Sequence, residues 1–242
     1  MRRFLRAGNP LLRRAVVCFV FVAVAFPAGV AGAQTPPDEA PVAAPAARPP
    51  RNPELRDLLG RLVQADQAVR ARALADPRTR PGHPITDPAV RALIRQWIET
   101  DRYNTATMKR IVDEHGWPGK RLVGEDGAHD AWLLVQHADG DRAFQKRCLV
   151  LIERAANRGD ASKIDMAYLT DRIRVAENKA QVYGTQFRQT PTGGMVVHVI
   201  EDEANVDARR KSVGLPPLAE YKKKLDEVYG GSGNAPPDGA KP

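Results

Sequence analysis

The sequence carries none of the short motifs that identify a common reaction. It has no H-E-x-x-H zinc motif, no glycine-rich phosphate loop, no C-x-x-C pair and no G-x-S-x-G elbow. These absences argue against zinc peptidases, P-loop nucleotide hydrolases, dithiol oxidoreductases and α/β-type serine hydrolases. No reaction follows from the sequence, so its function has to be argued from individual polar residues.

Cysteine is nearly absent, with two residues in a chain of 242. Cys18 lies in an apolar N-terminal run, which leaves Cys148 alone in the rest of the chain. One cysteine excludes an internal disulfide bond. Cys148 shares a helical face with Phe144 and Ile152, which predicts a small core residue rather than a reactive thiol.

The one long apolar run stands near the N-terminus. Five arginines precede it, residues 15–30 are almost wholly apolar, and Ala31-Gly32-Ala33 is a small-x-small site. This order is typical of a secretory signal cleaved after Ala33. We therefore expect an exported protein, periplasmic or extracellular, with no stable membrane insertion after cleavage. An uncleaved membrane anchor is the alternative.

Removing residues 1–33 changes the charge of the chain. The formal net charge is +8, and the segment holds five arginines and no acid, so subtracting five from eight leaves +3. This charge is small and scattered, and we expect no nucleic-acid partner.

The composition predicts one folded domain between two flexible segments. Residues 34–52 are rich in proline and alanine, which predicts an extended linker, and residues 230–242 resemble a disordered tail. The domain is expected at 53–229 and mainly α, with seven or eight helices and one β-hairpin. The periodicity places helices near 53–69, 88–98, 104–115, 125–138, 141–157, 162–176, 206–213 and 218–229, and strands at 181–187 and 195–200.

Polar residues follow the most apolar helix directly. Gln136, His137 and Asp139 come after the run 131–135, and a buried polar group needs a partner. His137 near a helix C-terminus can act as a general acid or base. In the alternative interpretation, Gln136 and His137 bond backbone carbonyls at the turn and Asp139 caps the next helix.

Two further groups of polar residues are candidates for a site. Tyr168, Asp171 and Arg172 share a helical face, so Arg172 either holds the Asp171 carboxylate in a cleft or belongs to an ordinary ion pair. In the first predicted strand, amide and phenol side chains suit glycan or peptide recognition and also occur as ordinary cross-strand pairs. Strand alternation places Gln181, Tyr183, Thr185 and Phe187 on one side and Val182, Gly184 and Gln186 on the other.

The sequence signal for a metal site is weaker than the signals for these groups. Asp126, His129 and Asp130 have helical spacings that bring them onto one face, but acids in a first turn are more often solvated. We expect neither a metal nor a cofactor.

Several motifs occur together in a fixed order. They are HGWP at 115–118, VG at 123–124, QHAD at 136–139, DR at 171–172, QVYGTQ at 181–186, and NVDARR at 205–210 followed by GLPP at 214–217. In this order they resemble a bacterial domain-of-unknown-function family, often exported, over about residues 104–221. The resemblance brings no activity. It implies a single constellation of Gln136, His137, Asp139, Asp171, Arg172, Tyr183 and Gln186.

Three hypotheses remain. The first is an exported helical domain that binds a small molecule, a glycan or an envelope protein. The second is an envelope hydrolase, and the third is a structural interaction protein. The ligand-binding candidates are Gln136, His137, Tyr168, Gln181, Tyr183 and Gln186. The catalytic candidates are His137, Asp139, Asp171 and Arg172.

Overall fold

The computed structural model describes residues 49–79, 85–189 and 195–229. The predicted signal, nearly all of the linker and the predicted tail lie outside these residues. Within them the chain forms seven α-helices and one two-stranded antiparallel sheet. The predicted mainly α fold with one β-hairpin is therefore confirmed.

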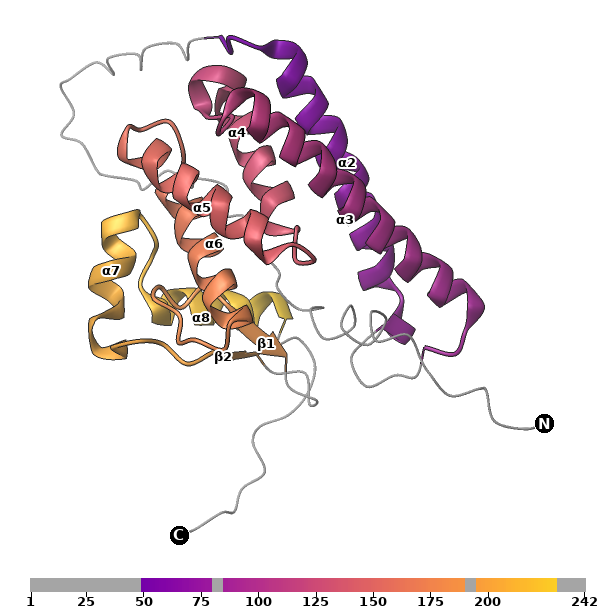
Figure 1. Cartoon of the computed structure of the whole chain (residues 1–242). Coiled ribbons are helices and arrows are strands. Elements are labelled where there is room, and N and C mark those ends of the chain that lie inside the picture. Colours follow the sequence, from indigo (N-terminus) through magenta and orange to yellow (C-terminus); the bar gives the residue numbers. More distant parts are fainter. Residues whose placement is uncertain (1–48, 80–84, 190–194, 230–242) are drawn as a thin grey trace, which may run out of the picture.

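Two long helices form an antiparallel hairpin, α2 (Pro53–Ala75) and α3 (Pro88–His115), on one side of the molecule (Figure 1). Each begins at a capping residue followed by proline: Asn52 accepts a hydrogen bond from a first-turn amide, and so does Asp87. The predicted break at Asn104 is wrong, because α3 continues through it and buries it. No glycine or proline interrupts α3, and an asparagine alone does not end a helix.

Helix α4 (Lys120–Gln136) begins earlier than the sequence pattern predicts, and it is kinked at Gly124, where φ is 79°. Its first turn is capped from a distance by Asp160, whose carboxylate accepts from the amide of Arg121 at 2.8 Å and whose carbonyl accepts from the amide of Lys120 at 2.9 Å. Gly119 allows this approach, since a Cβ there would lie 2.5 Å from the carbonyl oxygen of Asp160.

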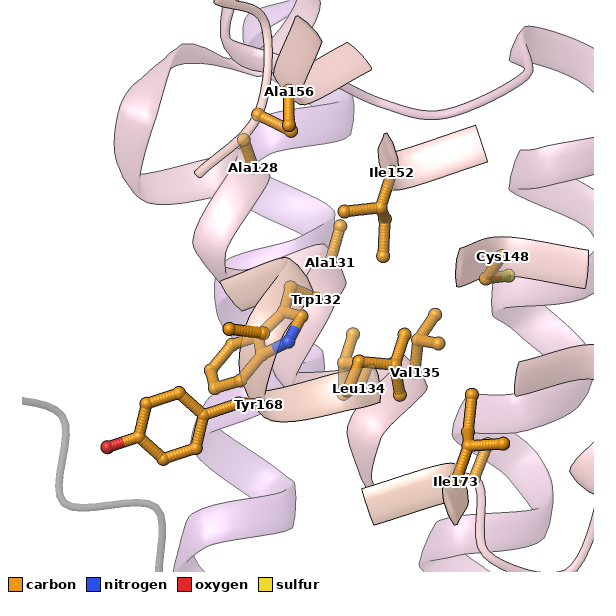
Figure 2. Packing of buried hydrophobic residues seen from close by; sticks show 14 of the residues in the cluster. Ala128, Ala131, Trp132, Leu134, Val135, Cys148, Ile152, Ala156, Tyr168 and Ile173 are labelled. Atoms are coloured by element: carbon orange, nitrogen blue, oxygen red, sulfur yellow. The ribbon is translucent and has the colours of Figure 1, made fainter. Parts of the chain in front are cut away.

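The core forms where α4 packs against α5 (Arg142–Asn157) and α6 (Lys163–Ala176). Figure 2 shows Leu134 and Val135 of α4 facing Cys148 and Ile152 of α5. These four side chains are completely buried, and burying each large aliphatic one stabilises the fold by about 1.5–3 kcal/mol. Burial also raises the pKa of the Cys148 thiol to about 12, so the predicted core role of this cysteine is confirmed.

The C-terminal third covers α6 with short elements. Strands β1 (Phe187–Gln189) and β2 (Met195–Val197) pair antiparallel, and α7 (Val206–Val213) and α8 (Leu218–Tyr229) follow. The predicted strand over 181–187 is wrong before Phe187, and its predicted alternation does not occur. Gln181 forms an isolated bridge to Ile200. The backbone then bends at Gly184, where φ is 66°, and the amides of Val182, Tyr183 and Thr185 bond the carboxylate of Asp171 instead of a neighbouring strand.

Candidate functional site

A buried histidine–aspartate pair joins the end of α4 to α2. The Nδ1 atom of His137 lies 2.8 Å from Oδ2 of Asp66, and Asp66 is wholly buried. Burial and the nearby charge of Arg70 lower the pKa of His137, against the opposing effect of Asp66. The imidazole is therefore neutral at neutral pH. A neutral ring beside an ionised carboxylate donates its Nδ1–H, which leaves the lone pair on Nε2.

Arg70 links this pair to a second carboxylate. Its Nε lies 3.1 Å from Asp66 and its Nη2 lies 2.5 Å from Asp101 of α3, while the guanidinium stacks on Trp97 with 4.6 Å to the ring centroid. Burial would raise the pKa of Asp66, but the hydrogen bond from His137 and the charge of Arg70 outweigh it and bring this pKa to about 2.

The pKa of Asp101 is shifted in the opposite direction from that of Asp66. Burial raises its pKa to about 7, with Arg70 opposing the rise and the Asp66 and Asp139 carboxylates adding to it. Two neighbouring carboxyls with pKa values far apart are typical of sites that need one acid and one base.

Asp139 lies in the turn after α4 and is held by Arg172 of α6. The two guanidinium bonds, Nε to Oδ1 at 2.9 Å and Nη2 to Oδ2 at 2.5 Å, form a bidentate pair. Burial opposes ionisation of Asp139, but the charge of Arg172 lowers its pKa. The alternative role for Asp139, capping the next helix, is wrong, because Asp141 accepts the first-turn amide of α5.

We call this set the polar cluster. Its members come from α2, α3, α5, α6 and the turn after α4: Asp66, Arg70, Asp101, His137, Asp139, Arg142 and Arg172. The side chains of Asp101, Asp139 and Arg142 are 24–27% exposed, whereas Asp66 is fully buried. The polar cluster thus has a buried inner part around Asp66 and a partly exposed edge formed by Asp101, Asp139 and Arg142.

Asp171 belongs to a second group of contacts. Its carboxylate is fully buried and accepts from the amides of Val182, Tyr183 and Thr185, at 2.6, 3.1 and 3.0 Å, and from the Thr185 hydroxyl at 3.0 Å. Consecutive helical residues point about 100° apart. Arg172 therefore faces the polar cluster while Asp171 faces residues 181–186.

Most of the predicted ligand-binding residues lie in this second group. Gln181 is fully buried and its amide bonds the backbone of Gln186 and His198. Tyr168 donates its hydroxyl to that of Tyr221 at 3.1 Å. Gln186 donates to the Thr185 hydroxyl, and Tyr183 is partly buried with its amide on Asp171. The seven-residue constellation expected from the family resemblance is therefore divided in two. Gln136, His137, Asp139 and Arg172 lie at the end of α4 or against it, and Asp171, Tyr183 and Gln186 lie on the other side of α6.

The predicted metal trio is divided among other partners. Asp126 pairs with Arg56 at 2.5 Å, and His129 lies 3.3 Å from Asp165. In residues 49–79, 85–189 and 195–229, no three His, Cys, Asp or Glu side chains are arranged to hold a metal ion.

Sequence reasoning missed four members of the polar cluster, Asp66, Arg70, Asp101 and Arg142. A signal for one of them was present. Asp66 occupies a position in the apolar stripe of α2, four residues after Leu62 and three before Val69. An acid at such a position predicts a buried partner.

Fold and site together define a helical-bundle domain with a partly buried cluster of acids, arginines and one histidine. The model of the family of unknown function DUF6624 matches residues 53–233, and the chain belongs to this family. The match covers α2 and the whole of α3, well before residue 104, and so includes Asp66, Arg70 and Asp101. No curated protein and no solved structure matches the chain. None of the described helices has both the length and the apolar character needed to cross a membrane.

Proposed function

We propose that this domain binds an uncharged, polyhydroxylated ligand of the cell envelope, a glycan, at the exposed edge of the polar cluster. The observation that carries the proposal is the convergence of three carboxylates, three guanidiniums and a neutral histidine at one partly exposed place. The proposal keeps the first hypothesis from the sequence, an exported ligand-binding domain, but assigns the binding site to the polar cluster.

The charge balance indicates the ligand class. Three ionised acids cancel three arginines, and protonation of Asp101 near neutral pH leaves a net charge of at most one, so the polar cluster exerts only a weak net attraction on an ion. Carboxylates accept hydrogen bonds and guanidiniums donate them, and a sugar hydroxyl does both. Trp97, beneath Arg70, adds an aromatic ring close to this edge.

Export is part of the proposal. It is supported by the basic N-terminal segment, the apolar run and the cleavage site at Ala33. Mass spectrometry of the protein recovered from its own cells tests it, and we expect the mature chain to begin at Gln34. A chain that keeps residues 1–33 would show that the apolar run is retained.

Ligand binding is tested with the mature chain and soluble cell-wall glycan fragments. A ligand at a hundred times its Kd stabilises by about 2.7 kcal/mol, which raises Tm by about 5–10 °C for a domain of this size. Asp101→Asn should weaken binding at least about tenfold. Asp113→Asn is the matched control on α3, since Asp113 is exposed and lies outside the polar cluster. Equal affinities in the two variants would contradict the proposed site.

Hydrolysis of the same ligand is the second candidate, favoured by the pKa of Asp101. Asp101 at about 7 supplies a proton donor near neutral pH, while ionised Asp139 and the neutral His137 supply bases. Asp101 takes the place that sequence reasoning gave to Asp171, whose carboxylate is occupied by backbone amides. Fragments that bind and stay intact over days between pH 5 and 8 would exclude hydrolysis and leave the binding function standing.

A further inference from the structure

A second site lies at the other end of α4 from His137. A surface pocket of about 580 Å³ opens there, between the α3–α4 turn, the first turn of α4 and the end of α5. Its volume lies within the range of small-molecule sites. It shares no residue with the polar cluster, so a ligand bound there would be independent of the proposed function.

The lining of this pocket is strongly basic. Four arginines contribute to it, Arg51, Arg121, Arg154 and Arg158, against the single carboxylate of Asp160. Arg154 and Arg158 are four residues apart at the end of α5, a spacing that places like charges side by side and destabilises an isolated helix.

Asp160 offsets the charge of Arg121 only. Its Oδ1 accepts from the backbone amide of Arg121 at 2.8 Å and lies 3.5 Å from the Nε of the same residue, so the carboxylate serves the first turn of α4. The guanidiniums of Arg51, Arg154 and Arg158 form no hydrogen bond or ion pair with any residue that the structure describes. The helix dipoles of α3 and α5 place the equivalent of about −0.5 elementary charge at each C-terminal end. Together these partial charges offset about one of the three positive charges of Arg51, Arg154 and Arg158.

The pocket also has an apolar wall, made by Trp117, Leu122 and Leu151. Guanidiniums bind phosphate and carboxylate groups through two parallel hydrogen bonds. We propose that this pocket binds a small organic anion with two or more phosphate or carboxylate groups, whose carbon frame packs on Trp117.

Isothermal titration of the full chain tests this site with two probes. Pyrophosphate offers phosphate charge without a carbon frame, and trimesate offers three carboxylates on a benzene ring. Arg154→Gln and Arg158→Gln should each weaken binding at least about tenfold. The matched control is Arg147→Gln, which removes one charge from the same helix at an exposed position paired with Asp113 outside the pocket. It should change the affinity less than twofold.

The two probes distinguish the class of anion. Tighter binding of pyrophosphate assigns the site to phosphorylated ligands, and tighter binding of trimesate assigns it to polycarboxylates. Arg158→Lys keeps the charge but loses the paired guanidinium donors, so its affinity should lie between those of the wild type and Arg158→Gln. Failure of both probes to bind at millimolar concentration, or an equal loss in Arg147→Gln and Arg158→Gln, would overturn the proposal. Neither result bears on glycan binding at the polar cluster.

Discussion

Replacing Asp171 with alanine tests the structural role of its carboxylate. In the folded protein this carboxylate accepts three backbone amides and one hydroxyl, all from residues 182–185. Removing it leaves these donors without an acceptor, and Asp171 itself is fully buried. The segment after α6 should lose its conformation.

The size of the effect follows from the contacts. A hydrogen bond to a charged group contributes about 1.5–3 kcal/mol, and the donors at Val182 and Tyr183 are partly exposed and can recover water. The two buried donors, the amide and the hydroxyl of Thr185, together contribute about 3–6 kcal/mol. Since burial opposes the charge and raises the pKa of Asp171, the net value is in the lower half of this range. We expect Asp171→Ala to lower the free energy of unfolding by about 4 kcal/mol, or Tm by about 8–16 °C.

Urea denaturation followed by circular dichroism measures this loss. Thr185→Val is the matched comparison. It keeps the three amide bonds and removes the hydroxyl, which donates to Asp171 and accepts from the Gln186 side chain, so it should cost about 2 kcal/mol. If Asp171→Ala lost less than about 1 kcal/mol, or no more than Thr185→Val, the carboxylate would not be what holds this segment, and Asp171 would again be a candidate for catalysis.

Three single residues carry the other predictions. In the folded state Asp101 keeps its proton up to about pH 7, whereas in the unfolded chain it loses it near pH 4, so its contribution to stability falls as pH rises through this window. The stability of Asp101→Asn relative to wild type, measured in urea at pH 5 and pH 8, should therefore increase with pH, by at most about 1.4 kcal/mol per pH unit, and a constant difference would refute the raised pKa. Cys148 should not react with a thiol reagent until the protein is denatured, because it is fully buried with a pKa of about 12, and rapid modification of the native protein would contradict this. Gly119→Ala should cost about 1–3 kcal/mol in thermal unfolding, since its Cβ would meet the Asp160 carbonyl, while Gly140→Ala, with open space around it, should change little.

The sequence was informative about the fold wherever hydrophobic periodicity and caps agreed. Asn52 and Asp87, each followed by proline, marked the starts of α2 and α3. The errors came from single residues whose local preference was overruled by their surroundings. Asn104 resembled a cap and lies buried inside a helix, and the segment before Phe187 alternated like a strand although a buried carboxylate takes up its amides.

The site was less accessible to sequence reasoning, because its contacts are long-range. His137 and Asp139 stood out since they come directly after an apolar run, but Asp66 is 71 residues away from His137 along the chain. Which helices lie against the end of α4 depends on packing that no local pattern specifies. The same holds for Asp171 and Arg172, adjacent in sequence yet bonded to different groups on different sides of α6.

The hairpin of α2 and α3 extends beyond the other helices (Figure 1). At its far end Val69, Ala73, Val90 and Ile94 are buried, but they lie outside the main hydrophobic core, so this end is held chiefly by contacts between its own two helices. We expect such a segment to open as a separate cooperative unit, with amides that exchange with deuterium long before those of α4. The polar cluster stands at the boundary between the two units. Any ligand that bridges α3 to the turn after α4 would join them, and protection of the far end of the hairpin would report binding from a distance.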